Sequence, residues 1–154
     1  SVYASRVAEK LRHERLSATV LTVFLTTNEF KDGPQYSNTL TITLPVATDS
    51  TAGLIRLALR GIRAIYRDGY LYKKAGVMLT GLVPASQTQA DLFDEQDRGK
   101  SKRLMSALDS INDRWGAGTL QYASSGISKA WKTRFNRRSP AYTTDWDALP
   151  IVNA

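Results

Sequence analysis

The side chains in this sequence that could do chemistry are mostly basic and hydroxyl groups. The 154 residues contain no cysteine and one histidine, which excludes a thiolate nucleophile, a disulfide framework and the usual zinc sites. His13, flanked by Arg12 and Glu14, is expected to be a surface residue with no special role. Twenty-one Lys and Arg against 14 Asp and Glu give a net charge of +7. This balance favours an anionic partner, with nucleic acid as the leading class.

The strongest electrostatic feature is a basic cluster near the carboxy-terminal end. From Arg114 to Thr144 the sequence has six basic residues, Arg114 included, and no acidic residue. Trp131 and Phe135 are four positions apart among them, and core packing explains these aromatics most simply. The charges then remain outside, free to meet DNA or a protein partner, or simply solvated. The cluster consists of Lys129, Lys132, Arg134, Arg137 and Arg138.

A row of threonines marks a second candidate surface. Thr39, Thr41 and Thr43 alternate with Leu40, Ile42 and Leu44, the period-2 pattern of a half-buried strand. One face of this strand is therefore expected in the core. The other is polar and free to contact another molecule.

Four arginines fall at spacings of four, three and four: Arg56, Arg60, Arg63 and Arg67. On a helix they share one exposed face, opposite the apolar stripe that packs on a sheet. They would then point away from the open face of that sheet. We expect them to be solvated, with a protein partner as the alternative.

These candidate surfaces require an α+β fold, a small sheet covered on one face by two helices. Hydrophobic periodicity predicts a helix, two strands, a helix and a strand over residues 3–16, 19–26, 39–44, 51–67 and 72–79. Pro45 is expected to end the second strand. A second, mostly helical region follows a polar linker. It is expected to contain a helix that Gly116 stops, a short strand over 119–123, and a basic helix from Ser125 to about Arg137. Because it is too small for a large core, we expect this region to dock on something.

Two segments, residues 72–79 and 139–144, closely resemble stretches of the UmuC-type Y-family translesion DNA polymerases. Residues 4–12 and 116–120 are similar to that family as well. The resemblance implies a little-finger domain over 1–84 that lacks its first strand, a linker over 85–99 and a tail domain over 100–154. It also implies that the catalytic palm, with its paired carboxylates and two magnesium ions, lies upstream. We therefore expect no catalytic residue, metal or cofactor in this chain.

The linker contains a motif that resembles the bacterial sliding-clamp binding pentapeptide. Gln89, Asp91, Leu92 and Phe93 match it, while Ala90 stands where leucine is commoner. An exposed Leu-Phe pair can fill a hydrophobic groove while the glutamine amide supplies a directional hydrogen bond. The alternative is that Leu92 and Phe93 fold back onto their own domain.

The resemblance also assigns DNA contacts to the open sheet face, because little fingers lay their sheet along the duplex. The candidates are Thr39, Thr41, Thr43, Lys73 and Lys74. Such contacts would hold phosphates without reading bases. Further implied partners are the processed UmuD dimer and the RecA filament. We expect a cytoplasmic protein of the SOS response without a membrane segment. The rival interpretation is a basic protein-interaction adaptor with no direct role in DNA binding.

Overall fold

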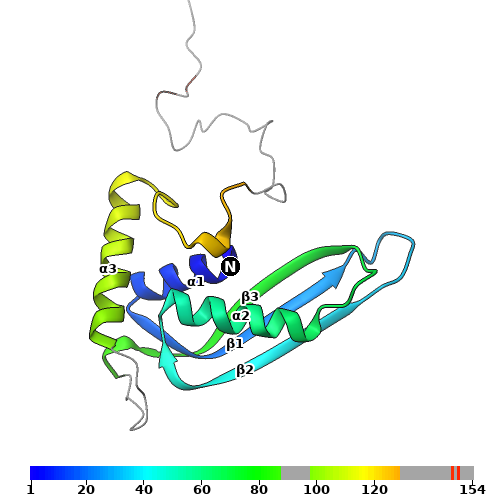
Figure 1. The fold of residues 1–154 in the computed structure, drawn as a ribbon, viewed down its shortest axis with the longest axis horizontal. Helices are drawn as coiled ribbons and strands as arrows, with labels where there is room; N and C mark the ends of the chain where they lie inside the picture. Colours follow the sequence, from blue (N-terminus) through cyan, green and yellow to red (C-terminus); the bar gives the residue numbers. More distant parts are fainter. Residues whose placement is uncertain (88–97, 129–146, 148, 150–154) are drawn as a thin grey trace, which may run out of the picture.

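The computed structural model describes residues 1–87, 98–128, 147 and 149. Its elements run α1 (Val2–His13), β1 (Leu16–Thr27), β2 (Ser37–Thr48), α2 (Thr51–Ile65), β3 (Tyr72–Pro84) and α3 (Arg98–Trp115), with short 3-10 turns at Ala85–Gln87 and Ala123–Ser125. Figure 1 shows the long, twisted sheet with α2 lying along it and α3 standing at one end. None of the helices in these described ranges is long and apolar enough to cross a membrane.

The sheet is antiparallel in the order β2-β1-β3, so β1 is its central strand. The run of β-branched residues in β1 suits a strand with a partner on each side. α1 and α2 pack with the sheet into one hydrophobic core, in which Leu21, Val23 and Leu54 are fully buried. The structure thus confirms the predicted α+β fold with two helices on the sheet.

Helix α2 begins with a serine cap and buries an apolar stripe. Its N-cap is Ser50, whose hydroxyl accepts a hydrogen bond from the Gly53 amide at 3.5 Å. Leu54, Ala58 and Ile65 are buried, as the predicted stripe requires. The buried face is tight at Gly61, where an added Cβ would come within 2.7 Å of the Val23 side chain. The glycine therefore lets α2 approach β1 closely.

The strands are longer than the sequence indicated. The prediction that Pro45 ends the second strand was wrong, because β2 continues through Pro45 to Thr48. An edge strand tolerates proline where its missing N–H would face away from the neighbouring strand. The pairing of β1 with β2 also shifts register between Ala18 and Val20, so the segment around Pro45 lies in an irregularity of the ladder.

The second region is partly described. α3 ends before Gly116, whose φ of +103° is the left-handed conformation that favours glycine at a helix end. The predicted strand over 119–123 was wrong, because residues 119 and 120 form a bend, residues 121 and 122 have no regular structure, and Ala123 begins a 3-10 helix. The predicted helix from Ser125 was wrong at its start, since residues 126–128 are not helical; its remainder lies outside the described residues.

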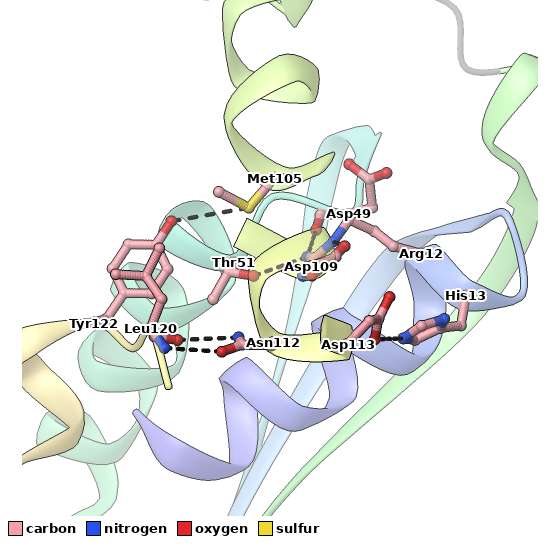
Figure 2. Close-up of polar contacts among 10 residues, drawn as sticks. All are labelled: Arg12, His13, Asp49, Thr51, Met105, Asp109, Asn112, Asp113, Leu120 and Tyr122. Atoms are coloured by element: carbon pink, nitrogen blue, oxygen red, sulfur yellow. Dashed lines mark hydrogen bonds and ion pairs between the residues drawn. The ribbon is translucent and has the colours of Figure 1, made fainter. Parts of the chain in front are cut away.

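Arg12 joins this second region to the first, as the sequence analysis expected of a region that must dock (Figure 2). Its guanidinium forms a two-pronged ion pair with Asp109 of α3, at 2.6 Å from Nε to Oδ2 and 2.7 Å from Nη2 to Oδ1. Nη1 also donates to the Asp49 carbonyl at 2.9 Å and to the Thr51 hydroxyl at 2.8 Å. We call these contacts the Arg12 junction. It links α1, α3 and the beginning of α2.

The segment after α3 is held by α3 itself and by the main core. Asn112, which is buried, donates to the Leu120 carbonyl at 3.0 Å and accepts from the Leu120 amide at 2.8 Å. Tyr122 then packs against the main core, with its hydroxyl 3.8 Å from the Met105 sulfur. Burial raises the pKa of Tyr122, and Arg12 opposes this shift. Residues 98–122 therefore dock through both polar and apolar contacts.

The core makes a first prediction about stability. Leu54→Ala removes a fully buried side chain and should lower the free energy of unfolding by about 2–5 kcal/mol. The matched control is Leu71→Ala, at a leucine that is 90% exposed, which should change it by less than about 0.5 kcal/mol. Urea unfolding monitored by circular dichroism measures both. Equal effects of the two variants would show that α2 does not close the core.

The Arg12 junction makes a second prediction. Asp109→Asn leaves the Arg12 guanidinium, 10% exposed in its side chain, without its carboxylate and should cost about 3 kcal/mol of docking free energy. The control, Ser110→Ala next to Asp109 on α3, changes an exposed side chain, so its cost should stay below about 0.5 kcal/mol. Hydrogen exchange of α3 amides distinguishes undocking from global unfolding. Unchanged exchange in Asp109→Asn would contradict the assigned role.

Candidate nucleic-acid interface

The face of the sheet opposite α1 and α2 is called here the open sheet face. It follows from the alternation along β1, because Leu21, Val23 and Leu25 point into the core and the residues between them point the other way. The strand register then places the partners of those residues on the same face. The open sheet face comprises Ser37, Thr39, Thr41 and Thr43 of β2, Val20, Thr22, Phe24 and Thr26 of β1, and Lys74, Gly76, Met78 and Thr80 of β3.

The predicted threonine row lies on this face. Thr39, Thr41 and Thr43 are all exposed, while Leu40 and Ile42 between them pack against the core. The Thr41 hydroxyl is 3.0 Å from the hydroxyl of Thr22, its cross-strand neighbour, so one of the two donates to the other. The hydroxyls of Thr39 and Thr43 flank this pair along β2. The row can therefore donate hydrogen bonds to an oxygen-rich ligand without carrying net charge.

The middle of the open sheet face is apolar and closely packed. The Phe24 ring lies against Gly76, where an added Cβ would come within 2.2 Å of the ring. The neighbouring Met78 is 52% exposed. Because Gly76 has no side chain, the Phe24 ring can pack directly against the backbone of β3.

The two candidate lysines occupy different positions. Lys74 pairs with Thr26 and lies on the open sheet face. Lys73 is the extra residue of a register irregularity, because Thr26 pairs with Lys74 and Thr27 with Tyr72. Both lysines are exposed. The register therefore brings Lys74 together with the hydroxyl groups and places Lys73 at the margin of the face.

Three of the four arginines in the predicted row lie on α2, and the fourth lies beyond its end. Arg56, Arg60 and Arg63 are exposed on the helix, which covers the opposite face of the sheet, as the sequence predicted. Arg67 lies beyond Ile65, the last residue of α2. Its guanidinium is 5.1 Å from the centre of the Tyr36 ring. Arg67 is thus part of an aromatic cluster and not of the helical row.

Sequence reasoning missed this aromatic cluster at one end of the sheet. The Tyr36 and Tyr70 rings are 5.0 Å apart and the Tyr66 and Tyr72 rings 5.4 Å apart, between centres. The Tyr36 hydroxyl donates to the Ile65 carbonyl at 2.6 Å, which fixes the end of α2 to the sheet. The sequence has four tyrosines between positions 36 and 72, which could have suggested an aromatic cluster. Their side chains come together only because the β1–β2 connection and the α2–β3 connection lie at the same end of the sheet.

Two predicted surfaces fall outside the described residues. These are the clamp-binding pentapeptide with Gln89, Asp91, Leu92 and Phe93, and the basic cluster of Lys129, Lys132, Arg134, Arg137 and Arg138. Both stay predictions from the sequence.

Comparison with known protein families adds an independent observation. Residues 1–92 match the impB/mucB/samB family C-terminal domain, a stretch that contains every strand of the described sheet. Residues 102–152 match a domain of unknown function, DUF4113. The family match accounts for the likeness that the sequence indicated on residues 72–79.

Individual relatives agree with the family match. The chain is 39% identical over 152 residues to protein ImpB of Salmonella typhimurium and 38% identical over 149 residues to protein UmuC of the same species, in each case over more than 95% of this chain. It spans about a third of the length of these relatives, 36% and 35%. It is also 30% identical over 115 residues to DNA polymerase IV of Caulobacter vibrioides, covering 75% of this chain and 27% of the relative. The chain therefore belongs to the impB/mucB/samB family, whose C-terminal domain it contains, and matches its UmuC-type members along nearly all of its length.

Proposed function

We propose that this chain is the DNA-gripping and partner-recruiting C-terminal region of an error-prone translesion DNA polymerase of the SOS response. The observation that carries the proposal is the combination of family membership with a sheet face that no described helix covers. The likeness to DNA polymerase IV supports a polymerase context. Nucleotide transfer and its magnesium ions would belong to other parts of such a polymerase, and this region would position the template-primer.

The chemistry of the open sheet face suits a DNA backbone better than DNA bases. Threonine hydroxyls donate single hydrogen bonds to phosphate oxygens, and Lys74 adds a positive charge next to them. Within the part of the chain that the structure describes, this face carries no helix or separate ribbon that could enter a groove and read base edges. A net charge of +7 favours approach to the duplex. Grip without sequence preference is what a polymerase that accepts many templates requires.

A third prediction tests where DNA lies. Lys73→Ala with Lys74→Ala removes two charges near the open sheet face, and Arg56→Ala with Arg60→Ala removes two from the opposite side. If two phosphates are released, the lysine variant should reduce the slope of log affinity against log salt by about 1.8. The arginine variant should leave the slope unchanged. Fluorescence anisotropy with a labelled primer-template duplex at several salt concentrations gives both slopes.

The threonine row has its own variant in the same assay. Thr39→Val, Thr41→Val and Thr43→Val together keep the strand-favouring side-chain shape while removing three hydroxyls. The triple variant should weaken DNA binding severalfold with little change in the salt slope, because no charge is lost. A salt slope that responds to the arginine pair and not to the lysine pair would place DNA on the helical side and refute this interface. Undetectable DNA binding by the unaltered chain would favour the rival adaptor function.

We also propose that the pentapeptide in residues 89–93 binds the sliding clamp. The motif combines a terminal amide with an adjacent apolar pair, Leu92 and Phe93. Short linear motifs of this kind gain most of their affinity from one or two apolar anchors in a groove. The motif lies in the sequence between β3 and α3.

A fourth prediction follows for this motif. Leu92→Ala with Phe93→Ala should weaken binding to the sliding clamp by about thirtyfold or more, the loss expected from one anchor worth about 2 kcal/mol. The control is Asp94→Ala with Glu95→Ala, which changes the two residues immediately after the motif. Calorimetric titration with purified clamp measures the affinities, and circular dichroism checks the fold. Equal affinity of the Leu92/Phe93 variant and the unaltered chain would disprove the assignment.

The basic cluster from Lys129 to Arg138 is proposed as a further contact surface. Its charge and its position within residues 102–152, the stretch matched by the domain of unknown function, support a partner other than the clamp. The proposed partners are the processed UmuD dimer, the RecA filament and DNA itself. A variant in which the five basic residues of the cluster are changed to alanine can be titrated against each of these partners separately. The partner whose affinity falls is the one that the cluster contacts.

A further inference from the structure

Three side chains that could bind a metal ion meet where α1 and α3 face each other. Glu9 and His13 come from α1 and Asp113 from α3, and one ligand atom of each lies within 4.8 Å of the other two. The His13 Nε2 is 3.7 Å from Asp113 Oδ1, and Figure 2 marks this contact with a dashed line. Among the residues that the structure describes, this is the one such group. It lies on the helical side of the fold, away from the open sheet face.

The geometry of the cluster follows from the two helices. Glu9 and His13 are four residues apart, so their side chains lie above one another on one face of α1. Asp113 is one turn beyond Asp109 on α3, and His13 directly follows Arg12. The two-pronged Arg12–Asp109 ion pair therefore sets the relative position of the helices immediately beside the cluster. The three ligands are held near one another before any ion arrives.

The charges of the cluster favour binding of a cation. Glu9 and Asp113 bring two carboxylates close together, which is unfavourable without a positive charge between them. The nearby Arg12 guanidinium is committed to Asp109, Asp49 and Thr51. His13 and Asp113 have side chains 52% and 57% exposed. An ion could thus reach the cluster from solvent, and water could complete its coordination.

The donor types indicate which ion would bind. One imidazole nitrogen with two carboxylate oxygens suits zinc and other first-row transition metals, whereas magnesium and calcium prefer oxygen ligands alone. The set differs from the cysteine-rich and histidine-rich sites that the sequence composition excludes.

We propose that Glu9, His13 and Asp113 form a binding site for a divalent transition-metal ion, zinc by preference, that clasps α3 to α1. Binding crosslinks two helices separated by about a hundred residues of sequence and stabilises the docked position of the second region. The site is independent of the magnesium ions of polymerase chemistry and of the proposed DNA interface.

The test uses the whole chain, freed of metal by a chelator that is then removed. Cobalt(II) serves as a spectroscopic substitute for zinc, and zinc itself is titrated by thermal unfolding. We expect visible ligand-field absorption with cobalt, displacement of cobalt by zinc, and a rise in melting temperature with zinc but not with magnesium. His13→Gln keeps the size and polarity of an exposed side chain while removing the imidazole. It should weaken cobalt binding at least about tenfold, since even outer-shell substitutions cost about 10–100-fold.

The matched control is Glu14→Gln, which alters an exposed carboxylate next to His13 outside the cluster. It should bind cobalt as the unaltered chain does. Asp113→Asn should weaken binding as His13→Gln does, which shows that both helices contribute. Zinc binding that is equal in the unaltered chain and in His13→Gln, or the absence of any cobalt spectrum, would overturn the proposal. Neither result would bear on DNA or clamp binding.

Discussion

The alternation of side chains along β1 is the constraint on which the rest of this structure depends. Leu21, Val23 and Leu25 point to one side and are covered by α1 and α2. Because a strand places successive side chains on opposite faces, the intervening residues must form a second surface. β2 and β3 extend that surface on both sides in register. One apolar pattern thus creates the core and, at the same time, the candidate DNA interface.

The second region is positioned by a different kind of interaction. α3 meets α1 through the Arg12 guanidinium, which satisfies two oxygens of Asp109 while also bonding to Asp49 and Thr51 at the start of α2. A partly buried, fully hydrogen-bonded ion pair specifies a unique geometry more strictly than apolar contact alone. Leu104 and Trp115 remain exposed at 57% and 61%, so polar contacts are important in placing α3. This arrangement gives a structural setting to part of the domain of unknown function that the chain contains.

Much of the fold could be predicted from the sequence because its signals are local. The period-2 threonine row and the apolar stripe of α2 each depend on residues a few positions apart. The predictions failed where contacts between distant parts of the chain determine the local structure. Pro45 fits inside β2 because β2 is an edge strand with a partner on one side only. Residues 119–123 do not form a strand because Leu120 bonds to the side chain of Asn112.

The sequence by itself determined the fold class, the polar character of one sheet face and the family resemblance, because each is encoded in contiguous residues. The tertiary structure alone decided that Arg12 pairs with Asp109, that Lys74 and not Lys73 aligns with the hydroxyl row, and that four tyrosines and Arg67 converge. It also brought Glu9, His13 and Asp113 together. These outcomes depend on strand register and on how helices cross, and no local pattern encodes the meeting of residues about a hundred positions apart.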